Sequence, residues 1–358
     1  MKDRFYYLML IINILCNFIL YVPNKMHEEL YNGVLYAIFI VLIMRFIFSY
    51  MQIYVFNTYK DLSLVEINKK LFNKVIGNII TFIYIIFNYT VGFFMYRGLV
   101  EIVNQFLLPN THILFVSILV LAIIYVDLFN DNKSYLNFIG YLAVIVIALS
   151  LIQLPIAFRE VKFFNIRGVI IHSNRLPKLS TIWTAAFFFS GVSHLTAFNP
   201  NFKKISWKKT FLVYILVGIP VALLSIYVPV GIWGPVAIQN IQFPWIATAD
   251  TLQLDLFFIE RVLFILLPLF FLLSASQLLN YNHVGYSLFK ELFPKKIYHI
   301  IFTVFCSILY LIITIVFRNS QSLMKTGSLF NSAFFLVNIA VSAISFFIIK
   351  VRGRVKKC

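Results

Sequence analysis

Acidic residues are scarce in this chain. Its 358 residues include 13 Asp and Glu against 30 Lys and Arg, with six His and only three Cys. No pair of carboxylates is evident for acid–base catalysis, and the HExxH, GxSxG and P-loop motifs do not occur. The cysteines form neither a disulfide framework nor a CxxC metal pattern. We therefore expect no catalytic residue, no metal and no cofactor, and the chain is not expected to be an enzyme.

Apolar residues dominate instead. The chain is 61% hydrophobic and 12% charged, with a mean hydropathy of +0.90, whereas a soluble domain is about 45–50% apolar and about 25% charged. A membrane-spanning helix needs roughly 20 mostly apolar residues. The qualifying runs are Phe5–Val22, Leu35–Phe56, Ile79–Leu108, Ile113–Leu128, Leu136–Phe158, Trp183–Phe198, Phe211–Val230, Leu254–Leu279, Tyr298–Phe317 and Leu329–Val351. The sequence thus predicts an all-α polytopic membrane protein with ten transmembrane helices, in a single integral membrane domain over residues 1–358.

The net charge of +17 has a membrane explanation and does not indicate nucleic acid as a partner. Lys and Arg collect in the cytoplasmic loops of membrane proteins, and most of them lie in inner loops and tails here if both termini face inside. The link at residues 159–180 runs against this bias, with five basic residues on the outer side. The basic tail, residues 352–358, is expected to anchor the chain inside and to touch anionic membrane lipid.

The predicted spans divide into two halves. Five fill residues 5–158, five fill residues 183–351, and a polar linker, residues 159–182, joins them. Five plus five is typical of an inverted-repeat transporter fold. In such folds the ligand binds at the bilayer midplane between helices that are discontinuous at matching positions of the two halves. The first and sixth spans are the matching pair here.

Both of these spans carry polar interruptions. The first contains Asn13, Cys16 and Asn17, and the sixth reads FFFSGVSHLTAFNP over residues 187–200. A helix at membrane depth breaks only where its freed backbone groups face protein, water or ligand. Gly191 can adopt the dihedral angles of a break, and Ser193 can cap the restarted half-helix. The new N-terminus would then attract a carboxylate. Alternatively, Gly and Ser allow two intact helices to pack closely.

Several stretches, in order along nearly the whole chain, carry a family resemblance. NTYKDLSLVEINKKLFNKVIGNIITFIY (57–84) has the polar loop and the glycine turn that precede the third span. YRGLVEIVNQFLLPNTH (96–112) and LQLDLFFIERVLFILL (252–267) carry further motif residues, which are Arg97, Glu101, Pro109, Thr111, Phe257, Phe258, Glu260 and Arg261. With the 187–200 stretch, these segments resemble the B subunits of spore germinant receptors, the spore germination permease-like proteins. Two departures are visible: the family's first-span glycines are absent, and Val192, Ser193 and His194 stand where the family has an acidic residue.

The resemblance implies a LeuT-like fold of the amino acid–polyamine–organocation (APC) type. It implies a germinant-binding subunit that works with an A subunit and a lipoprotein C subunit in the spore inner membrane. We expect a small nutrient, most simply an amino acid, to bind between the first, third, sixth and eighth spans. The expected ligand-binding residues are Asn13, Cys16, Asn17, Phe93, Arg97, Phe189, Ser190, Gly191, Val192, Ser193 and His194. Of these, His194 is a single histidine on a mostly apolar helix, and such a residue is more often a packing residue than a ligand residue.

Charged residues near the span ends are read as structural ion pairs. Arg97 and Glu101 are one helical turn apart and can pair on one helix face. Glu260 and Arg261 are adjacent and point apart, so each needs another partner. Intramembrane charges are functional candidates by default, and the alternative is that these residues tie the third and eighth spans together.

Three functions stay open at this point. The first is germinant sensing, the second is amino-acid transport by an APC-type transporter, and the third is a membrane scaffold without a ligand. No Asp or Glu falls at the centre of a predicted span, which favours sensing over proton-coupled transport. The loop over residues 233–253 contains Pro and Trp and is predicted to cap the ligand site from outside.

Overall fold

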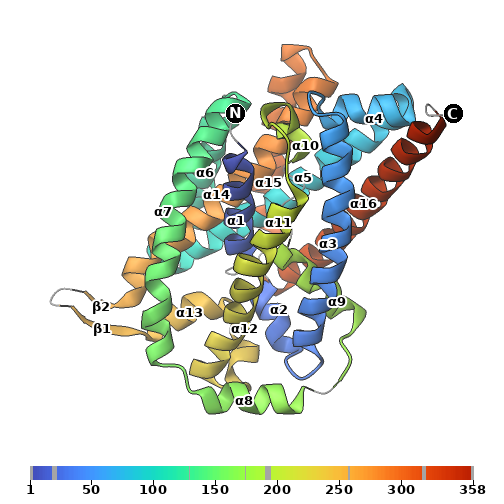
Figure 1. Ribbon diagram of the computed structural model, residues 1–358. Coiled ribbons are helices and arrows are strands. Elements are labelled where there is room, and N and C mark those ends of the chain that lie inside the picture. The colour runs from blue at the N-terminus through green and yellow to red at the C-terminus, as the bar shows by residue number, and fades with distance from the viewer. Residues whose placement is uncertain are drawn as a thin grey trace.

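Long helices run side by side through the molecule, and shorter elements close its two ends (Figure 1). The structure is a computed structural model that describes residues 3–17, 22–128, 130–173, 175–189, 195–256, 259–316 and 320–355. The first half contains α1 (Arg4–Asn17), α2 (Val22–Glu28), α3 (Val34–Thr58), α4 (Leu64–Phe72), α5 (Lys74–Ile102), the π-helical η1 (Val103–Leu107), α6 (Ile113–Leu128) and α7 (Asn132–Arg159). The connecting helix is α8 (Phe163–His172).

The second half is more broken. Its helical elements are α9 (Leu179–Ala185), the 3₁₀ turn η2 (Ala186–Phe189), α10 (Leu195–Phe198), the 3₁₀ turn η4 (Asn199–Asn201), α11 (Trp207–Val213), the π-helical η5 (Tyr214–Gly218), α12 (Ile219–Trp233), the 3₁₀ turn η6 (Ala237–Asn240), α13 (Pro244–Thr251), α14 (Val262–Leu292), α15 (Lys296–Val316) and α16 (Ser320–Val355). The strands β1 (Gln253–Leu256) and β2 (Ile259–Arg261) pair antiparallel before α14.

The hairpin corrects one expectation. The eighth span was expected to be helical from Leu254, but the helix starts at Val262 and the preceding residues form strands. Leu254, Asp255 and Leu256 alternate apolar and polar side chains, which is the period of a strand. Over the described residues the fold is therefore helical apart from this two-stranded hairpin, which projects from the side of the molecule (Figure 1).

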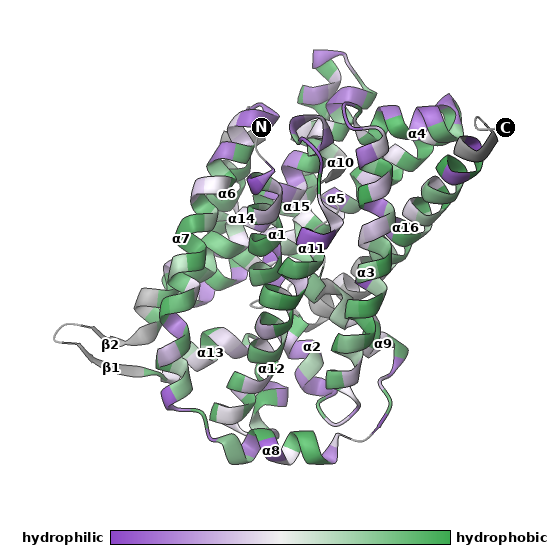
Figure 2. Cartoon of the chain, in the orientation of Figure 1, coloured by the Kyte–Doolittle hydropathy of each residue, from purple (hydrophilic) through white to green (hydrophobic). Residues whose placement is uncertain are grey.

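The chain is a multi-pass membrane protein. Within the described residues, six helices are long and apolar enough to cross a membrane, and α1 with α2 makes a seventh if the bent pair is one span. The six are Val34–Thr58, Lys74–Leu107, Asn132–Arg159, Trp207–Trp233, Lys296–Val316 and Ser332–Arg352. Hydrophobic residues cover the length of these helices and hydrophilic residues gather at both ends of the bundle (Figure 2).

The two ends of the bundle differ in content. The start of α1 and the finish of α16 lie at one end, here called the terminal end, together with α4 and α10 (Figure 1). The opposite end, here called the far end, carries α8 and α13. The 233–253 loop expected to form a cap lies at this far end and is packed down, since Trp245 and Ile246 of α13 are buried.

Local sequence signals explain where several helices begin. Ser63 and Glu66 form a reciprocal capping box at the start of α4, and the Asp131 side chain caps α7. The side chain of Asn73 caps α5 while its backbone has a φ of 88°. At the next turn, a Cβ on Gly77 would lie 2.6 Å from the backbone nitrogen of Lys69, so only glycine lets α4 lie this close to α5.

At the centre, α14 packs along α5. Two glycines allow the close approach, as small residues do in membrane helix pairs. A Cβ on Gly92 would lie 2.9 Å from Asn282 Nδ2, and one on Gly285 would lie 2.8 Å from Tyr89 Cε2. The third and eighth predicted spans therefore form the central pair of the bundle, and the interrupted first and sixth segments pack beside them.

Candidate functional site

The first segment changes direction in the middle of the bundle. Helices α1 and α2 meet at an angle of 44°, and the joining residues, 18–21, lie outside the described ranges. Asn13, Cys16 and Asn17 all lie in the last two turns of α1 and are buried. The polar residues that the sequence singled out therefore sit at the end of a half-helix inside the protein.

The sixth segment is also irregular. The α-helix α9 ends at Ala185 and tightens into the 3₁₀ turn η2, and the next described element is the short helix α10, which begins at Leu195. The predicted site residues Ser190, Gly191, Val192, Ser193 and His194 all fall outside the described residues. A break at Gly191 and a cap by Ser193 therefore stay predictions, while Phe189 is described and fully buried.

The two irregular segments meet at Phe189. Its ring packs edge-on against Tyr214 of η5, with 5.8 Å between ring centroids. A Cβ on Gly218 would lie 2.9 Å from Phe189 Cε1 and 3.9 Å from Ile14 Cδ1. Thus α1, η2 and η5 converge here, and α1 also contacts α14. We call the region where these elements meet the central junction.

Arg45 of α3 lies beside the central junction, and sequence reasoning did not select it as a site residue. Its side chain is 7% exposed, and its Nε has no hydrogen-bond partner. The guanidinium carbon lies 4.5 Å from the centroid of the Phe335 ring. The titratable side chains that interact with it electrostatically are Tyr214, Tyr281 and Tyr6. The only signal in the sequence was a basic residue in the middle of the second apolar run.

Phe93 and Arg97 lie on α5 in other surroundings. Phe93 packs against Tyr310, with 5.5 Å between ring centroids, and it lines a groove of about 250 Å³ between α5 and α15. Arg97 is 3% exposed, and its Nη1 lies 3.6 Å from Glu101 Oε2. Gln242 Nε2 donates to Glu101 Oε1 at 3.1 Å, so this pair links α5 to the far-end loop. The assignment of Phe93 and Arg97 to the ligand site stays a prediction.

The other two charged residues that were expected in a membrane span lie outside the membrane helix. Glu260 and Arg261 lie in strand β2, not in the first turn of a membrane helix. The cause is the alternating sequence before α14, which forms the hairpin. The expectation that these two charges stand within the eighth span is therefore wrong.

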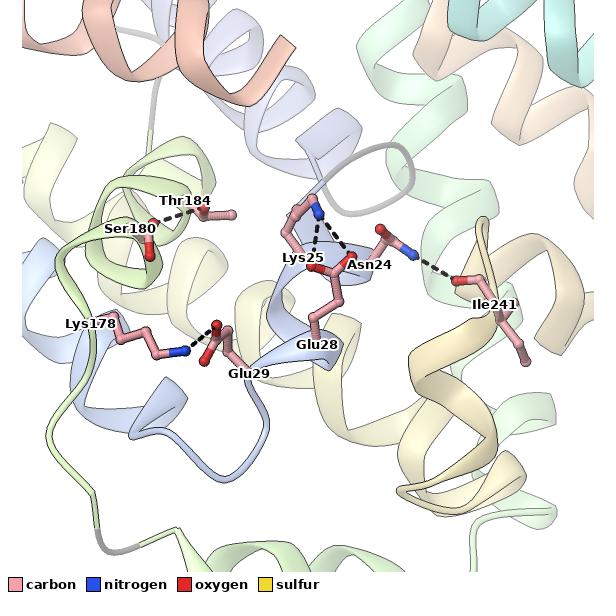
Figure 3. Close-up of polar contacts among 8 residues, drawn as sticks. All are labelled: Asn24, Lys25, Glu28, Glu29, Lys178, Ser180, Thr184 and Ile241. Carbon is pink, nitrogen blue, oxygen red and sulfur yellow. Dashed lines mark hydrogen bonds and ion pairs between the residues drawn. The ribbon is translucent and has the colours of Figure 1, made fainter. Parts of the chain in front are cut away.

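Polar contacts at the far end join the two interrupted segments (Figure 3). Lys178, directly before α9, donates from Nζ to Glu29 Oε1, directly after α2, at 2.8 Å. Asn24 Nδ2 of α2 donates to the Ile241 carbonyl at 2.8 Å, and His27 Nε2 donates to the Ile226 carbonyl at 2.9 Å. We call these contacts the far-end clasp. Through it, α2 is held to α9, to α12 and to the loop before α13.

The far-end clasp changes the pKa of the Glu29 carboxylate. Partial burial alone raises the pKa of Glu29, but hydrogen bonds from Lys178 and Asn32 together bring the pKa below its usual value. The carboxylate is therefore ionised at neutral pH, and the ion pair with Lys178 is formed.

The terminal end of the sixth segment is held by neutral groups. Asn199, after α10, donates from Nδ2 to the carbonyls of Tyr59, Lys60 and Leu62 at 2.9, 3.1 and 2.8 Å. Asn57 donates to the Ile205 carbonyl at 2.8 Å and accepts from the Ile205 N–H at 3.0 Å. We call these contacts the terminal-end clasp. The two clasps hold both ends of the sixth segment.

The described residues offer no metal site, since no group of three or more His, Cys, Asp or Glu among them could hold an ion. Comparison with known proteins gives the family. A family model described as spore germination protein matches residues 3–322, and no curated protein matches the chain. The match covers most of the chain, including α1 to α15 and the central junction. The chain therefore belongs to the spore germination protein family, whose members are permease-like membrane proteins.

Proposed function

We propose that this chain is the germinant-sensing membrane subunit of a spore germinant receptor. It binds a small nutrient, most simply an amino acid, at the central junction and so triggers germination. The observation that carries the proposal is the family match over residues 3–322, in a chain whose first and sixth segments are both irregular where they meet. Buried Asn13, Cys16 and Asn17 at the end of α1 give such a pocket its polar lining.

The fold that suits this function is a ten-span inverted repeat of the LeuT or APC type. Repeat one covers residues 5–158, the linker 159–182 carries α8, and repeat two covers residues 183–351. The central pairing of α5 with α14 supports this assignment, because these would be the third spans of the two repeats. A midplane ligand site between discontinuous helices is the general arrangement in such folds.

The proposal includes partners and a location. The subunit works with an A subunit and a lipoprotein C subunit in the spore inner membrane, with the terminal end in the cytoplasm and the far end facing away. Single-cysteine labelling from one side of the membrane tests the orientation. A label at Gln239 of the far-end loop that enters only from the cytoplasmic side contradicts it.

Binding and germination together test the function. Purified chain is screened for stabilisation by amino acids and nucleosides, and spores that lack the chain are scored for germination with each compound. We expect at least one compound that both stabilises the purified chain and loses its germination response in the deletion spores. Compounds that do not bind serve as the control, since their responses should persist. Absence of any such compound contradicts the proposal.

A glycine substitution tests the broken-helix pocket itself. We expect Gly191→Leu to abolish the germination response while the protein stays in the membrane with its partners, because a side chain there enters the pocket or strains the backbone. Such strain costs on the order of 1–3 kcal/mol. Gly191→Ala should weaken the response less. A Gly191→Leu protein that disappears from the membrane indicates instead a packing glycine between intact helices.

The alternative function is amino-acid transport by an APC-type transporter, and the family's permease-like character favours it. A transporter moves its ligand across the membrane in repeated cycles, whereas a sensor only needs to bind it. Because no Asp or Glu stands at the centre of a predicted span, we expect no proton-driven uptake by the isolated chain in proteoliposomes. Robust proton-dependent accumulation of an amino acid would decide for the transporter.

A further inference from the structure

Arg45 is a buried cation without a carboxylate partner among the described residues. Their ion pairs are Lys25–Glu28, Arg97–Glu101 and Lys178–Glu29, and none includes Arg45. Its electrostatic neighbours are three tyrosines and no Asp or Glu. Arg45 is the twelfth of the 25 residues of α3, so it lies near the middle of this apolar helix, far from both ends of the bundle.

Such a position is costly for a guanidinium. Removing a charge from water is strongly unfavourable unless a partner compensates, and a charged residue inside a membrane span is a functional candidate for this reason. The Phe335 ring lies under the guanidinium and offers some compensation. A ring meets only one face of the planar group, however, and the N–H donors point along its edges. Nε is buried without an acceptor.

The groups around Arg45 come from several elements of the central junction. Tyr6 belongs to α1, Tyr214 to η5 and Tyr281 to α14, and each interacts electrostatically with Arg45. Tyr281 also interacts with Cys16 at the end of α1, and Tyr214 accepts a hydrogen bond from Ser49 Oγ at 3.4 Å. Tyrosine side chains do not neutralise the guanidinium. Among the described residues, this neighbourhood therefore carries one uncompensated positive charge.

We propose that Arg45 is the counter-ion for the carboxylate of the ligand, and that the ligand is a small molecule of net negative charge. This inference rests on the proposed function, because it assumes that the central junction binds a nutrient. A planar guanidinium suits a carboxylate, which accepts two parallel N–H bonds from it. Since no acidic side chain among the described residues pairs with Arg45, we expect an ammonium group on the ligand to add little to binding.

Ligand charge is tested on the unaltered full chain with matched compounds. The panel contains the common amino acids, their 2-hydroxy-acid analogues, which keep the carboxylate without the ammonium, their amides, which keep the ammonium without the carboxylate, and inosine. Thermal unfolding of the purified chain in lipid nanodiscs reports binding. We expect a hydroxy acid to stabilise the chain at least as well as its amino acid, and the amide and inosine to have no effect.

Variants then assign the effect to Arg45. We expect Arg45→Gln to weaken binding of the active carboxylate by about tenfold or more, the usual size for a lost charge-assisted hydrogen bond. The control is Arg167→Gln, the same change at an exposed position of α8, which should bind as the unaltered chain does. Arg45→Met removes the buried charge and keeps an apolar chain. We expect it to unfold on the order of 2 °C higher without ligand and to bind no carboxylate.

The outcomes separate this inference from the proposed function. If an amide or inosine stabilises the chain and Arg45→Gln responds equally, the chain binds a nutrient but Arg45 is not its counter-ion. The same holds if a carboxylate binds Arg45→Gln and Arg45→Met with unchanged affinity. If no compound of the panel stabilises the unaltered chain, the nutrient-sensing function fails and this inference fails with it.

Discussion

Two arginines are buried within the described helices, and their surroundings differ. Arg97 of α5 stands one turn from Glu101, which also receives a hydrogen bond from Gln242. Arg45 of α3 has an aromatic ring and tyrosines around it, and no acidic side chain interacts with it among the described residues. Both guanidinium groups keep buried nitrogens without a hydrogen-bond partner, which are Nε and Nη1 in Arg97 and Nε in Arg45. The difference is the nearby carboxylate, so we propose a structural ion pair for Arg97 and a ligand carboxylate as the counter-ion of Arg45.

The largest effect should come from removing the partner of Arg97. Glu101→Gln leaves the Arg97 guanidinium buried beside a neutral group, which we expect to lower the free energy of unfolding by about 2 kcal/mol. Loss of one partner of a fully buried pair costs about 3–5 kcal/mol, and Glu101 keeps 19% of its exposure. Chemical unfolding of the purified chain measures the change. Glu160→Gln, at an exposed position after α7, should be neutral. Equal stability of both variants contradicts a structural role for the pair.

A charge-conserving change at Arg45 should have the next largest effect. Arg45→Lys keeps the positive charge but loses the planar fork and most of the stacking on Phe335. We expect carboxylate affinity to fall about fivefold, about 1 kcal/mol, which is a smaller loss than for Arg45→Gln. Titration calorimetry with the active compound measures it. An Arg45→Lys protein that binds as tightly as the unaltered chain shows that charge alone suffices.

A methyl group at Gly218 tests whether a shift of the Phe189 ring in the central junction changes ligand binding at Arg45. The added Cβ would lie 2.9 Å from Phe189 Cε1, so the Phe189 ring must shift against Tyr214, an electrostatic neighbour of Arg45. We expect Gly218→Ala to weaken ligand binding about threefold and to cost about 1 kcal/mol of stability. Gly168→Ala is the matched control, since nothing lies within 4 Å of its added Cβ. Unchanged binding by Gly218→Ala separates Phe189 from the site.

The smallest effect concerns an ion pair exposed to water. Glu29 has a pKa below its usual value in the folded chain, so its contribution to stability is present above the unfolded-state pKa, about 4.3. The contribution is lost as the pH falls through the lowered folded-state pKa. Because Lys178 is 60% exposed, we expect about 0.5 kcal/mol at pH 7. The stability difference between the unaltered chain and Glu29→Gln, measured from pH 7 downward, should shrink as the pH falls. A difference that grows with acid contradicts this sign.

Much of the fold could be predicted from the sequence because apolar length is a local property. Each of the predicted runs contains helical residues, and the buried polar residues of α1 were visible as interruptions. The predicted start of the eighth span was wrong because it was based on apolar composition alone. The alternation of apolar and polar residues at Leu254, Asp255 and Leu256 predicts a strand. The packing role of Gly77 was also hidden, since the nearness of Lys69 is a matter of tertiary structure.

The candidate site was less predictable, and Arg45 shows why. Its position in an apolar run indicates a special residue, but not which elements surround it. Arg45 is a candidate counter-ion because its neighbours among the described residues are tyrosines and not carboxylates. These tyrosines come from α1, η5 and α14 and are up to 236 positions away from Arg45 in the sequence. Spacing predicts a partner only within one helix, as for Arg97 and Glu101. The expected site residues from Ser190 to His194 lie outside the described chain and stay predictions.

The two clasps on the sixth segment respond differently to ionic strength. The far-end clasp includes the ion pair of Lys178 with Glu29. The terminal-end clasp consists of the neutral side-chain amides of Asn199 and Asn57 and the backbone groups to which they bind. Salt shortens the reach of charges from about 8 Å at 0.15 M to about 3 Å at 1 M, and it leaves neutral hydrogen bonds nearly unchanged. We therefore expect rising salt to weaken the Lys178–Glu29 contact of the far-end clasp and to leave the terminal-end clasp nearly unchanged. The same rise in salt concentration therefore affects the far end of the sixth segment more than its terminal end.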